Sequence, residues 1–395
     1  MKICFSVTSF PLLSQTFVLS QVLYAVRDGH EVTVACSSIG PSAALSEDQR
    51  DALRDVKVVQ WPPSESAIFD YLPIGLKNRI AARRSRDAWR RLIDADLIIA
   101  HFGYRGATVA RAQHDWPNRP PLVTFFHGRD VSVEFRRNKL KKYQNLFADG
   151  DLFLTVNRAF ADRLLEGGAP SARVRPHHLG IPVSRYTFSQ SPRQTPLRLV
   201  SVCRLVEKKG INVALDALAK LSKDHPEIDW CFDIGGDGPL EPDLRDQANR
   251  LGIAGHVEFL GPLKHDETLR RIAEADIMLL PSVTAPDGDQ EGIPVTLMEA
   301  MALGTAVCTT RHSGIPELVT HGETGLLSDE HDAACLAANI YRLASAEGPD
   351  LTQAARQKVE RDFNEDRQNA LLLDLCRDLI AHGFEDQNSS AAENK

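Results

Sequence analysis

Residues 282–304 read SVTAPDGDQEGIPVTLMEAMALG and form the most informative part of the chain. They follow the apolar run at residues 277–281, IMLLP, which is typical of a buried strand. The residues PDGD at 286–289 predict a loop, and Pro294 suits the first turn of a helix over residues 295–303. A strand, a loop and a helix start in this order form the corner where doubly wound α/β sheets hold their ligands.

Two glutamates stand at this corner. Glu291 precedes the predicted helix, and Glu299 lies about one turn inside it. The helix start offers unpaired N–H groups and the positive end of the helix dipole to a phosphate. Carboxylates so close to an anion would bind phosphate poorly, but they accept hydrogen bonds from hydroxyl groups. The pattern therefore predicts a ligand that has both phosphate and the hydroxyl groups of a sugar or ribose.

Strand and helix patterns alternate along the rest of the chain. Runs that are apolar on both faces suit strands of a parallel sheet covered by helices. Such runs occupy residues 3–7, 32–36, 97–100, 122–126, 152–156, 197–202, 230–234, 257–260, 277–280, 306–309 and 325–327. Amphipathic segments predict helices at residues 15–27, 157–166, 211–221, 240–251 and 295–303. This alternation predicts the α/β class with doubly wound sheets.

The length of 395 residues suggests two domains. A polar, Pro-containing segment at residues 181–196 is typical of a linker. We therefore predict an N-terminal Rossmann-like domain at residues 1–185 and a C-terminal one at residues 186–364, facing a cleft between the carboxyl ends of their strands. A helix at residues 365–384 is expected to pack back on the N-terminal domain, and the polar tail at residues 385–395 is expected to be disordered.

The cysteines and the start of the chain exclude several protein classes. Seven cysteines are present, an odd number, and no two are spaced as C-x2-C, so neither a zinc site nor a disulfide framework is expected. The N-terminus lacks a basic region followed by a long apolar stretch, and no run approaches about 18 apolar residues. These features predict a cytoplasmic protein without a transmembrane helix and without a metal site.

Charge is distributed unevenly between the two halves of the chain. Residues 1–185 contain 26 Lys and Arg against 18 Asp and Glu, whereas residues 186–395 contain 20 against 35. The first half therefore suggests contact with an anionic partner. A nucleic acid is not expected, because the whole chain has a net charge of −7 and no aromatic-interleaved basic motif.

The basic residues of the first half form two groups. The first comprises Lys77, Arg79, Arg83, Arg84, Arg86, Arg90 and Arg91. The second comprises Arg136, Arg137, Lys139, Lys141 and Lys142. The first group lies in an amphipathic helical pattern. These groups predict contact with an anionic substrate or with the inner face of an anionic membrane, as a peripheral protein makes. The alternative is a solvated helix face without a partner.

The segment EGIPVTLME, which begins at Glu291, resembles the Glu-x7-Glu motif of retaining family 4 glycosyltransferases, which have the GT-B fold. The longer form DGDQEGIPVTLMEAMA resembles the branch that builds bacterial exopolysaccharides, including colanic acid and amylovoran. The resemblance implies a hexosyltransferase that takes its sugar from a UDP- or GDP-sugar and needs neither a cofactor nor a metal. It also implies a glycan acceptor, for which we expect a polyprenyl-diphosphate-linked oligosaccharide.

The resemblance implies a set of donor-binding residues in the second half of the chain. VSVCRLVEKKG at residues 200–210 is similar to the family segment whose Arg and Lys bind the donor diphosphate, which implies Arg204 and Lys209, with the adjacent Lys208 as the alternative. Such cations stabilise a leaving diphosphate in place of a metal ion. Further donor-binding residues are Gly292, Ile293, Pro294, Val295 and Thr296 at the helix start, Gly236 in IGGDGPL and Leu260 in VEFLG.

The two glutamates receive separate roles from the same resemblance. Glu299 is expected to hold the ribose of the donor, and Glu291 is expected to bind a hydroxyl group of its sugar. Glu291 is thus expected to recognise the sugar rather than to act as a nucleophile. Glu317, in SGIPE, lies in a further stretch that resembles the family and is an additional candidate.

In the first half, FPLLSQTF at residues 10–17 is close to the FPxLSETF of the branch. It places Ser14, Gln15 and Thr16 at a predicted helix start, where they suit capping or contact with an anion. The family usually has a glycine-rich loop at this place, so the roles of the individual side chains stay open.

Two histidines follow apolar strands in the first half. The His-Gly-x-Asp pattern of the family maps onto FFHGRD and implies that His127 faces the donor sugar, with Asp130 as a second candidate or as the cap of the next helix. His101, in AHFG, is either a further functional residue or a structural one. Both histidines stand where a sheet presents its ligand-binding edge.

The resemblance implies sugar transfer with retention at the anomeric carbon, in exopolysaccharide biosynthesis. Charge builds up on the leaving phosphate, so preorganised cations are expected to dominate catalysis. Two alternatives remain: an epimerase or phosphorylase of the same fold, and a sensor of sugar nucleotides without catalysis. A nicotinamide dehydrogenase is disfavoured, since no G-x-G-x-x-G fingerprint is present.

Overall fold

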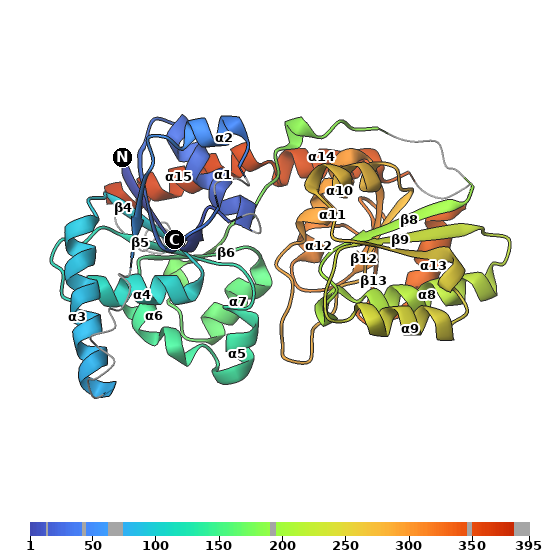
Figure 1. Ribbon diagram of the computed structural model, residues 1–395, viewed down its shortest axis with the longest axis horizontal. Helices are drawn as coiled ribbons and strands as arrows, with labels where there is room; N and C mark the ends of the chain where they lie inside the picture. Colours follow the sequence, from blue (N-terminus) through green and yellow to red (C-terminus); the bar gives the residue numbers. More distant parts are fainter. Residues whose placement is uncertain (13–14, 42–44, 62–73, 190–194, 346–349, 383–395) are drawn as a thin grey trace, which may run out of the picture. The chain divides into compact units, whose positions relative to one another are not determined.

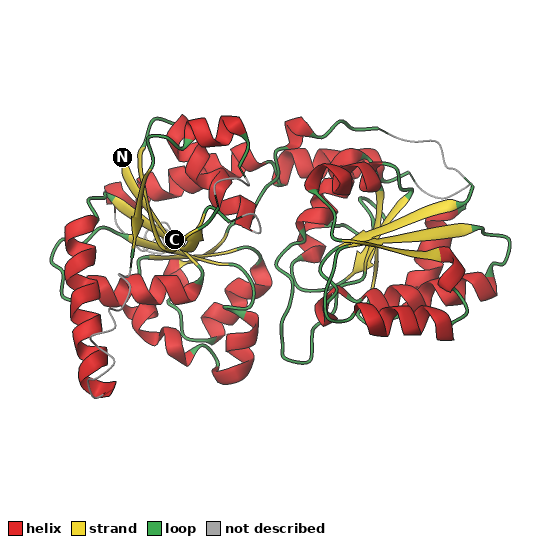
Figure 2. Cartoon of the chain, in the orientation of Figure 1, coloured by secondary structure: helices red, strands yellow, loops and turns green. Residues whose placement is uncertain are grey.

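The computed structural model describes residues 1–395 except 13–14, 42–44, 62–73, 190–194, 346–349 and 383–395. The chain forms two compact units (Figure 1), of which the first comprises Met1–His177 and Asp366–Lys395 and the second comprises His178–Glu365. Each unit has a parallel sheet with helices on both faces (Figure 2). The predicted class of two doubly wound α/β sheets is therefore confirmed.

The sheet of the first unit has seven strands in the order β3-β2-β1-β4-β5-β6-β7. Every residue of β4 and β5 is buried, as expected for central strands covered on both faces. The strands are β1 (Lys2–Phe10), β2 (Glu31–Ile39), β3 (Lys57–Gln60), β4 (Leu97–His101), β5 (Leu122–Phe126), β6 (Leu152–Thr155) and β7 (Val174–Pro176). The helices are α1 (Thr16–Arg27), α2 (Glu47–Ala52), α3 (Ile74–Leu92), α4 (Gly103–Gln113), α5 (Ser132–Asn138), α6 (Gln144–Asp149), α7 (Arg158–Glu166) and α15 (Glu365–His382).

The sheet of the second unit has six strands in the order β10-β9-β8-β11-β12-β13. They are β8 (Leu197–Val202), β9 (Trp230–Gly235), β10 (Val257–Gly261), β11 (Ile277–Leu280), β12 (Ala306–Thr310) and β13 (Leu326–Ser328). The helices are α8 (Ile211–Asp224), α9 (Glu241–Arg250), α10 (His265–Ala273), α11 (Val295–Leu303), α12 (Ile315–Leu318), α13 (Ala333–Ala344) and α14 (Thr352–Asp362).

Alternate residues of β8 show why this sheet needs helices on both faces. Leu197 and Leu199 belong to one core cluster, with residues of α8, α9 and α13. Val200 and Val202 belong to another, with residues of α11, α12 and α14. Since successive side chains of a strand point to opposite faces, a continuous apolar run can be buried only between two layers of helices.

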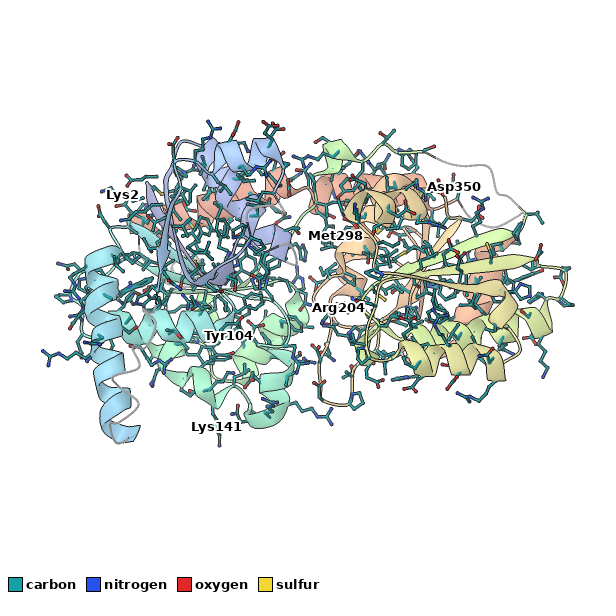
Figure 3. All side chains as sticks on the ribbon, viewed as in Figure 1. Lys2, Tyr104, Lys141, Arg204, Met298 and Asp350 are labelled. Carbon is teal, nitrogen blue, oxygen red and sulfur yellow. The ribbon has the colours of Figure 1, made fainter. Side chains whose placement is uncertain are left out.

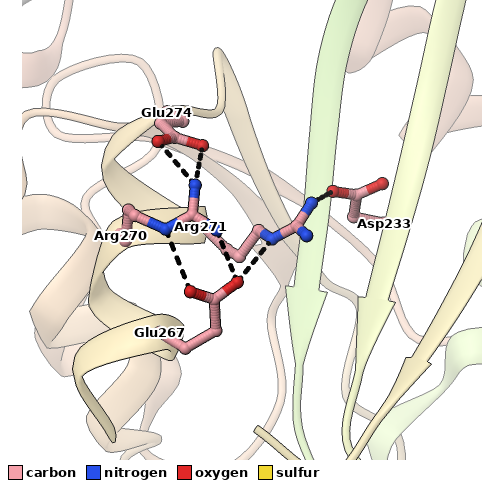
Figure 4. A network of polar contacts seen from close by, with 5 residues as sticks. All are labelled: Asp233, Glu267, Arg270, Arg271 and Glu274. Atoms are coloured by element: carbon pink, nitrogen blue, oxygen red, sulfur yellow. Dashed lines mark hydrogen bonds and ion pairs between the residues drawn. The ribbon is translucent and has the colours of Figure 1, made fainter. Parts of the chain in front are cut away.

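A polar network ties α10 to the sheet of the second unit (Figure 4). Arg270 lies within 2.8 Å of carboxylate oxygens of both Glu267 and Glu274, which follow the i, i+3 and i, i+4 spacings of a helix. Arg271 reaches from the same helix to Asp233 of β9, at 2.9 Å. The side chains of these pairs are between 25% and 50% exposed, so each pair is expected to contribute only modestly to stability.

Each sheet reverses its strand order at one point. In the first unit the reversal lies between β1 and β4, and in the second unit it lies between β8 and β11. The strands are parallel, so the loops after both members of each pair meet at the same edge. Doubly wound sheets bind ligands outside this edge at the switch point. The loops after β1, β4, β8 and β11 therefore lie where a ligand is expected to bind.

The boundary between the units differs from the predicted one. It falls between His177 and His178 rather than after residue 185, because Ile181, Val183 and Tyr186 are buried in the core of the second unit. The segment predicted as a linker is thus partly core. Its residues 190–194 and the predicted disordered tail at 385–395 lie outside the described residues.

The C-terminal helix α15 contributes to the first unit from Asp366 onward. Asn369 donates a hydrogen bond to the Ser20 Oγ, and Arg377 pairs with Asp28 at 2.6 Å. The two short edge strands β3 and β7 have no counterpart in the sequence predictions. Most residues of β3 are exposed, so it lacks the continuous apolar run used to recognise strands.

Candidate functional site

A lysine and a glutamate meet at the switch point of the second unit. Lys209 ends a 3-10 helix, Glu207–Lys209, that follows β8, and Glu291 lies in the loop between β11 and α11. The Lys209 Nζ is 2.7 Å from the Glu291 Oε1, and the side chains are 13% and 9% exposed. The topology thus turns two motifs that are far apart in sequence into one nearly buried ion pair.

The pKa shifts of the two residues indicate that both are charged. Burial acts to lower the pKa of Lys209, but the Glu291 carboxylate more than offsets it, so this pKa lies above its ordinary value. Burial acts to raise the pKa of Glu291, but Lys209 and Lys208 more than offset it, so this pKa lies below its ordinary value. Each charge therefore keeps the other ionised in a nearly dry place.

The two neighbouring cations have different surroundings. The Lys208 Nζ is 3.3 Å from the Asp289 Oδ1 and also donates to the Gln290 carbonyl, so Lys208 holds the loop before Glu291. Arg204, labelled in Figure 3, lies beyond the end of β8 and is exposed. No ion pair between the described residues involves it. Its guanidinium is therefore available to an anionic ligand.

The first N–H groups of helix α11, like those of any helix start, lack the i−4 carbonyl partners that later residues have. Pro294 stands just before the first helical residue, with ψ at 123°, and not within the first turn where we predicted it. Among the described residues, no side chain caps this helix start, and its first turn contains no acidic residue. The surrounding residues are Gly292, Ile293, Val295 and Thr296, and Val295 is exposed. Such a helix start suits a phosphate or another anion.

Glu299 lies on α11 in a buried, weakly polar place. Its side chain accepts a hydrogen bond from the Tyr186 hydroxyl at 3.3 Å, and His265 approaches it at 3.9 Å. Burial raises the pKa of Glu299 to about 7, and the bond from Tyr186 counteracts this only in part. The Glu299 carboxyl group thus titrates near neutral pH, and its oxygens can accept further hydrogen bonds from hydroxyl groups.

Gly236 brings a turn of the chain close to the end of β8. Its φ is 119°, and a Cβ atom placed on it would lie 1.9 Å from the carbonyl oxygen of Cys203. Its N–H donates to the Gly261 carbonyl at 2.7 Å, which joins this turn to the end of β10. Leu260 lies in β10 and is half-buried. Only glycine fits this turn.

The two histidines of the first unit are hydrogen-bonded to each other. The His101 Nδ1 lies 3.0 Å from the His127 Nε2, at the ends of the adjacent strands β4 and β5. His101 is fully buried, and His127 packs among the rings of Phe17, Phe102 and Phe125. Burial lowers the pKa of His101 to about 3, and burial together with His101 lowers the pKa of His127. Both imidazoles are therefore neutral at pH 7.

Asp130 organises the backbone after β4 and β5. Its carboxylate accepts hydrogen bonds from the N–H groups of Gly103, His127 and Gly128, at 2.9, 3.1 and 2.8 Å. The side chain is buried, and burial raises its pKa. It therefore holds the start of α4 and the turn that presents His127.

The start of α1 is less defined than the sequence predicts. Gln15 precedes the helix and Thr16 is its first residue, but neither forms a side-chain cap. Ser14 lies outside the described residues. The interpretation of this segment as a cap is therefore not supported for Gln15, because among the described residues its side chain accepts no hydrogen bond from an N–H group of the first turn.

Glu317 has a partner in its own unit. Its Oε2 lies 2.8 Å from the His178 Nε2, at the start of the short helix α12. His178 in turn stacks on Phe363, with 4.9 Å between ring centroids. These contacts join α12 to the segment that enters the second unit and indicate an architectural role.

Two kinds of feature are absent from the residues that the structure describes. No three His, Cys, Asp or Glu side chains come together in a way that could hold a metal ion. Within the same residues, no helix is both long and apolar enough to cross a membrane.

Two residues that contact the predicted glutamates of the second unit were not predicted from the sequence. Tyr186 lies in the segment predicted to be a linker, yet it contacts Glu299. His312 follows β12, and its Nε2 accepts a hydrogen bond from the Glu291 N–H at 3.0 Å. The only sequence signal for His312 was its place directly before the SGIPE motif, after an apolar strand.

Models of two glycosyltransferase domains match the chain in tandem. Glycosyltransferase Family 4 matches residues 14–185, and Glycosyl transferases group 1 matches residues 184–361. The chain is 35% identical to the putative colanic acid biosynthesis glycosyltransferase WcaL of Salmonella typhimurium, over 96% of this chain and 100% of that protein. It is also 35% identical to the amylovoran biosynthesis glycosyltransferase AmsK of Erwinia amylovora, over 92% of this chain and 96% of that protein.

Solved structures support the fold. The structure of Anabaena HepE in complex with UDP and glucose aligns with a TM-score of 0.73 and 21% identity, over 96% of this chain and 100% of that one. The lipopolysaccharide outer core galactosyltransferase WaaB also aligns with a TM-score of 0.73, at 18% identity, over 95% of this chain and 100% of that one. The chain has the GT-B fold and belongs to the family of glycosyltransferases that includes the colanic acid and amylovoran biosynthesis enzymes WcaL and AmsK.

Proposed function

We propose that the protein transfers a hexose from a UDP- or GDP-sugar to a growing exopolysaccharide chain, with retention of the anomeric configuration. The observation that supports this most directly is the arrangement at the switch point of the second unit. The Lys209–Glu291 ion pair, the exposed Arg204 and the uncapped start of α11 lie at the carboxyl ends of neighbouring strands. These are groups suited to a diphosphate and to sugar hydroxyl groups.

In this proposal the cations act on the leaving group. Arg204, Lys209 and the N–H groups at the start of α11 stabilise the negative charge that develops on the diphosphate. A metal ion is then not required. Activity that persists in the presence of a chelator is expected, and loss of activity there would contradict this part of the proposal.

The glutamates recognise hydroxyl groups in this proposal. Glu291, whose charge is balanced by Lys209, accepts a hydrogen bond from the sugar, and Glu299 accepts from the ribose. His127 is assigned a contact with the donor sugar on the basis of the family motif. As a neutral imidazole, it can donate or accept one hydrogen bond there.

The names of the relatives support a role in exopolysaccharide biosynthesis. WcaL and AmsK are named for the biosynthesis of colanic acid and amylovoran, and the chain matches them over nearly their full length. We propose that the acceptor in this chain's reaction is a polyprenyl-diphosphate-linked oligosaccharide at the inner face of the cell membrane. Exposed basic residues of the first unit, including Arg136, Arg137, Lys139 and Lys141, provide a surface for anionic lipid.

One set of experiments tests the proposed function. Thermal shifts with UDP, GDP and their hexose derivatives identify the donor, because a ligand at 100 times its Kd stabilises by about 2.7 kcal/mol. NMR of the product from the identified donor then reports the anomeric configuration. A product with the opposite configuration contradicts retention, and isomerised sugar without transfer favours an epimerase. Binding without hydrolysis or transfer favours a sensor.

A further inference from the structure

His312 supports the backbone of Glu291 from a neighbouring strand. It lies between β12 and α12 and is fully buried. Its Nε2 is 3.0 Å from the backbone nitrogen of Glu291, and its Nδ1 is 2.6 Å from the Oε1 of Glu330. Both ring nitrogens are therefore engaged, one with the backbone of Glu291 and one with a carboxylate.

These two contacts determine where the ring proton lies. A backbone N–H can only donate, so the Nε2 that faces Glu291 must be the unprotonated acceptor. In a neutral imidazole the proton is then on Nδ1, from which it donates to the Glu330 carboxylate. Glu330 thus fixes the tautomer that His312 needs in order to accept from Glu291.

Glu330 also holds the other end of the same loop. Its Oε2 accepts from the Thr284 N–H at 2.7 Å, and the Thr284 Oγ1 accepts from the Gln290 side-chain amide at 2.8 Å. Thr284 follows β11, His312 follows β12 and Glu330 follows β13, which are adjacent strands of one sheet. The order of the strands therefore brings three loops together around Glu291.

We propose that His312, oriented by Glu330, is a positioning residue that fixes the backbone of Glu291 and thereby places its carboxylate beside Lys209. Without this bond the N–H of Glu291 would be buried without an acceptor, which would lower the stability of this loop conformation. The inference rests on the proposed function only for the task of Glu291, namely recognition of the donor sugar.

Protonation of His312 would break this arrangement. An imidazolium has N–H groups on both nitrogens, so the Nε2–H would face the Glu291 N–H, donor against donor. Glu330, the Glu291 carboxylate and Lys208 act on the charge of the ring, and burial outweighs the two carboxylates, so the pKa of His312 lies below its ordinary value. The neutral ring therefore persists at neutral pH and is lost only in acid.

The kinetic test uses two substitutions of His312 and a matched control. His312→Leu removes the acceptor, and we expect turnover of the identified UDP- or GDP-sugar to fall about tenfold while the affinity for the free nucleotide stays unchanged. His312→Gln provides a carbonyl oxygen in its place and cannot be protonated, so turnover near the wild-type value at neutral pH, with less loss in acid, is expected. His321→Leu is the control, because the His321 Nδ1 likewise accepts from a backbone N–H in the same unit, at 2.9 Å, but from Leu327 on β13 rather than from Glu291.

The same substitutions are then made in a Glu291→Gln background. If His312 acts through Glu291, His312→Leu has little further effect on turnover there. Equal losses in both backgrounds, or an equal loss in His321→Leu, would overturn the inference. Wild-type turnover of Glu291→Gln itself would instead contradict the task proposed for Glu291.

A spectroscopic measurement tests the position independently of any activity. In protein with 15N-labelled histidine, the ring signals of His312, assigned by comparison with His312→Gln, are expected to show the proton on Nδ1 at neutral pH. Glu330→Gln is expected to weaken this preference. A proton on Nε2 in the wild-type protein would exclude the bond from the Glu291 N–H and overturn the inference, whatever the substrate is.

Discussion

Lys209 and Glu291 neutralise each other at the edge of the second sheet, with 2.7 Å between the Lys209 Nζ and the Glu291 Oε1. The lysine arrives from the loop after β8 and the glutamate from the loop after β11, which are adjacent parallel strands. A donor diphosphate that approaches the lysine must therefore share it with a carboxylate. The two opposite charges balance each other locally, so the position of the lysine depends on the position of the glutamate.

Removing one member of this pair is expected to reduce both stability and activity. Lys209→Met leaves the Glu291 carboxylate nearly buried without its partner, which costs about 3 kcal/mol of unfolding free energy. The double variant Lys209→Met/Glu291→Gln removes both charges and is expected to recover most of that stability, but not the turnover. Urea unfolding and donor turnover are measured on each protein.

The control for this prediction is Lys220→Met, which breaks a surface pair with Asp224 on α8. Its expected cost is below about 1 kcal/mol, since exposed pairs contribute little. A double variant as unstable as the single one would contradict the interpretation of the pair as a balanced, nearly buried unit.

Arg204 is expected to affect turnover without affecting stability. Its side chain is exposed and forms no ion pair with any described residue, so Arg204→Ala removes no contact that stabilises the free protein. Loss of one charge-stabilising donor costs roughly 2.7–4 kcal/mol in the transition state, and we expect a corresponding fall in turnover of about 10² to 10³. Matched measurements of melting temperature and turnover check this, with Arg185→Ala as a control on the same unit. Wild-type turnover of Arg204→Ala would show that Arg204 does not act on the donor.

The sequence predicted the central strands of both sheets because these are buried on both faces. The runs at 122–126 and 277–280 are apolar throughout, and the structure has β5 and β11 there. It did not predict the two edge strands β3 and β7, whose residues alternate less clearly and are partly exposed. The segment around Tyr186 was predicted to be a linker because single apolar residues between prolines give no periodic signal.

For the candidate site, motifs gave individual residues but not their partners. The Glu-x7-Glu pattern pointed to Glu291 and Glu299. The resemblance of residues 200–210 to the family pointed to Arg204 and Lys209, with Lys208 as the alternative. The ion pair between Lys209 and Glu291 depends on the strand order, because β8 and β11 become neighbours only through the reversal in the sheet. The support of Glu291 by His312 depends likewise on β12 being next to β11.

Gly236 is expected to be irreplaceable for a conformational reason. A Cβ atom there would lie 1.9 Å from the Cys203 carbonyl oxygen, and the φ of 119° is unfavourable for any other residue. Gly236→Ala is therefore expected to lower the unfolding free energy by about 2 kcal/mol or more. Gly255→Ala is the control, since its Cβ would meet nothing within 4 Å. Urea unfolding of the two variants makes the comparison, and equal stabilities would contradict the geometry of this turn.

Glu299 is expected to release a proton when nucleotide binds. Burial raises its pKa to about 7, so a large fraction of the free protein has a protonated Glu299 at neutral pH. Between the ordinary pKa of 4.5 and about 7 the folded state binds more protons than the unfolded state, so the contribution of Glu299 to stability falls as pH rises through this window. Ribose hydroxyl groups donate to the ionised form and therefore favour its deprotonation.

The affinity for UDP should accordingly weaken as pH falls below 7, by up to about tenfold per pH unit from this group alone. Calorimetry in buffers of different ionisation enthalpy measures the released protons. Titration of the phosphate is common to all variants, so the difference between wild type and Glu299→Gln isolates Glu299. Tyr186→Phe removes a hydrogen bond that lowers this pKa, and it should therefore shift the window of proton release to higher pH. Identical proton release in wild type and Glu299→Gln would show that the ribose does not contact Glu299, and the role of this residue on α11 would then be confined to the fold.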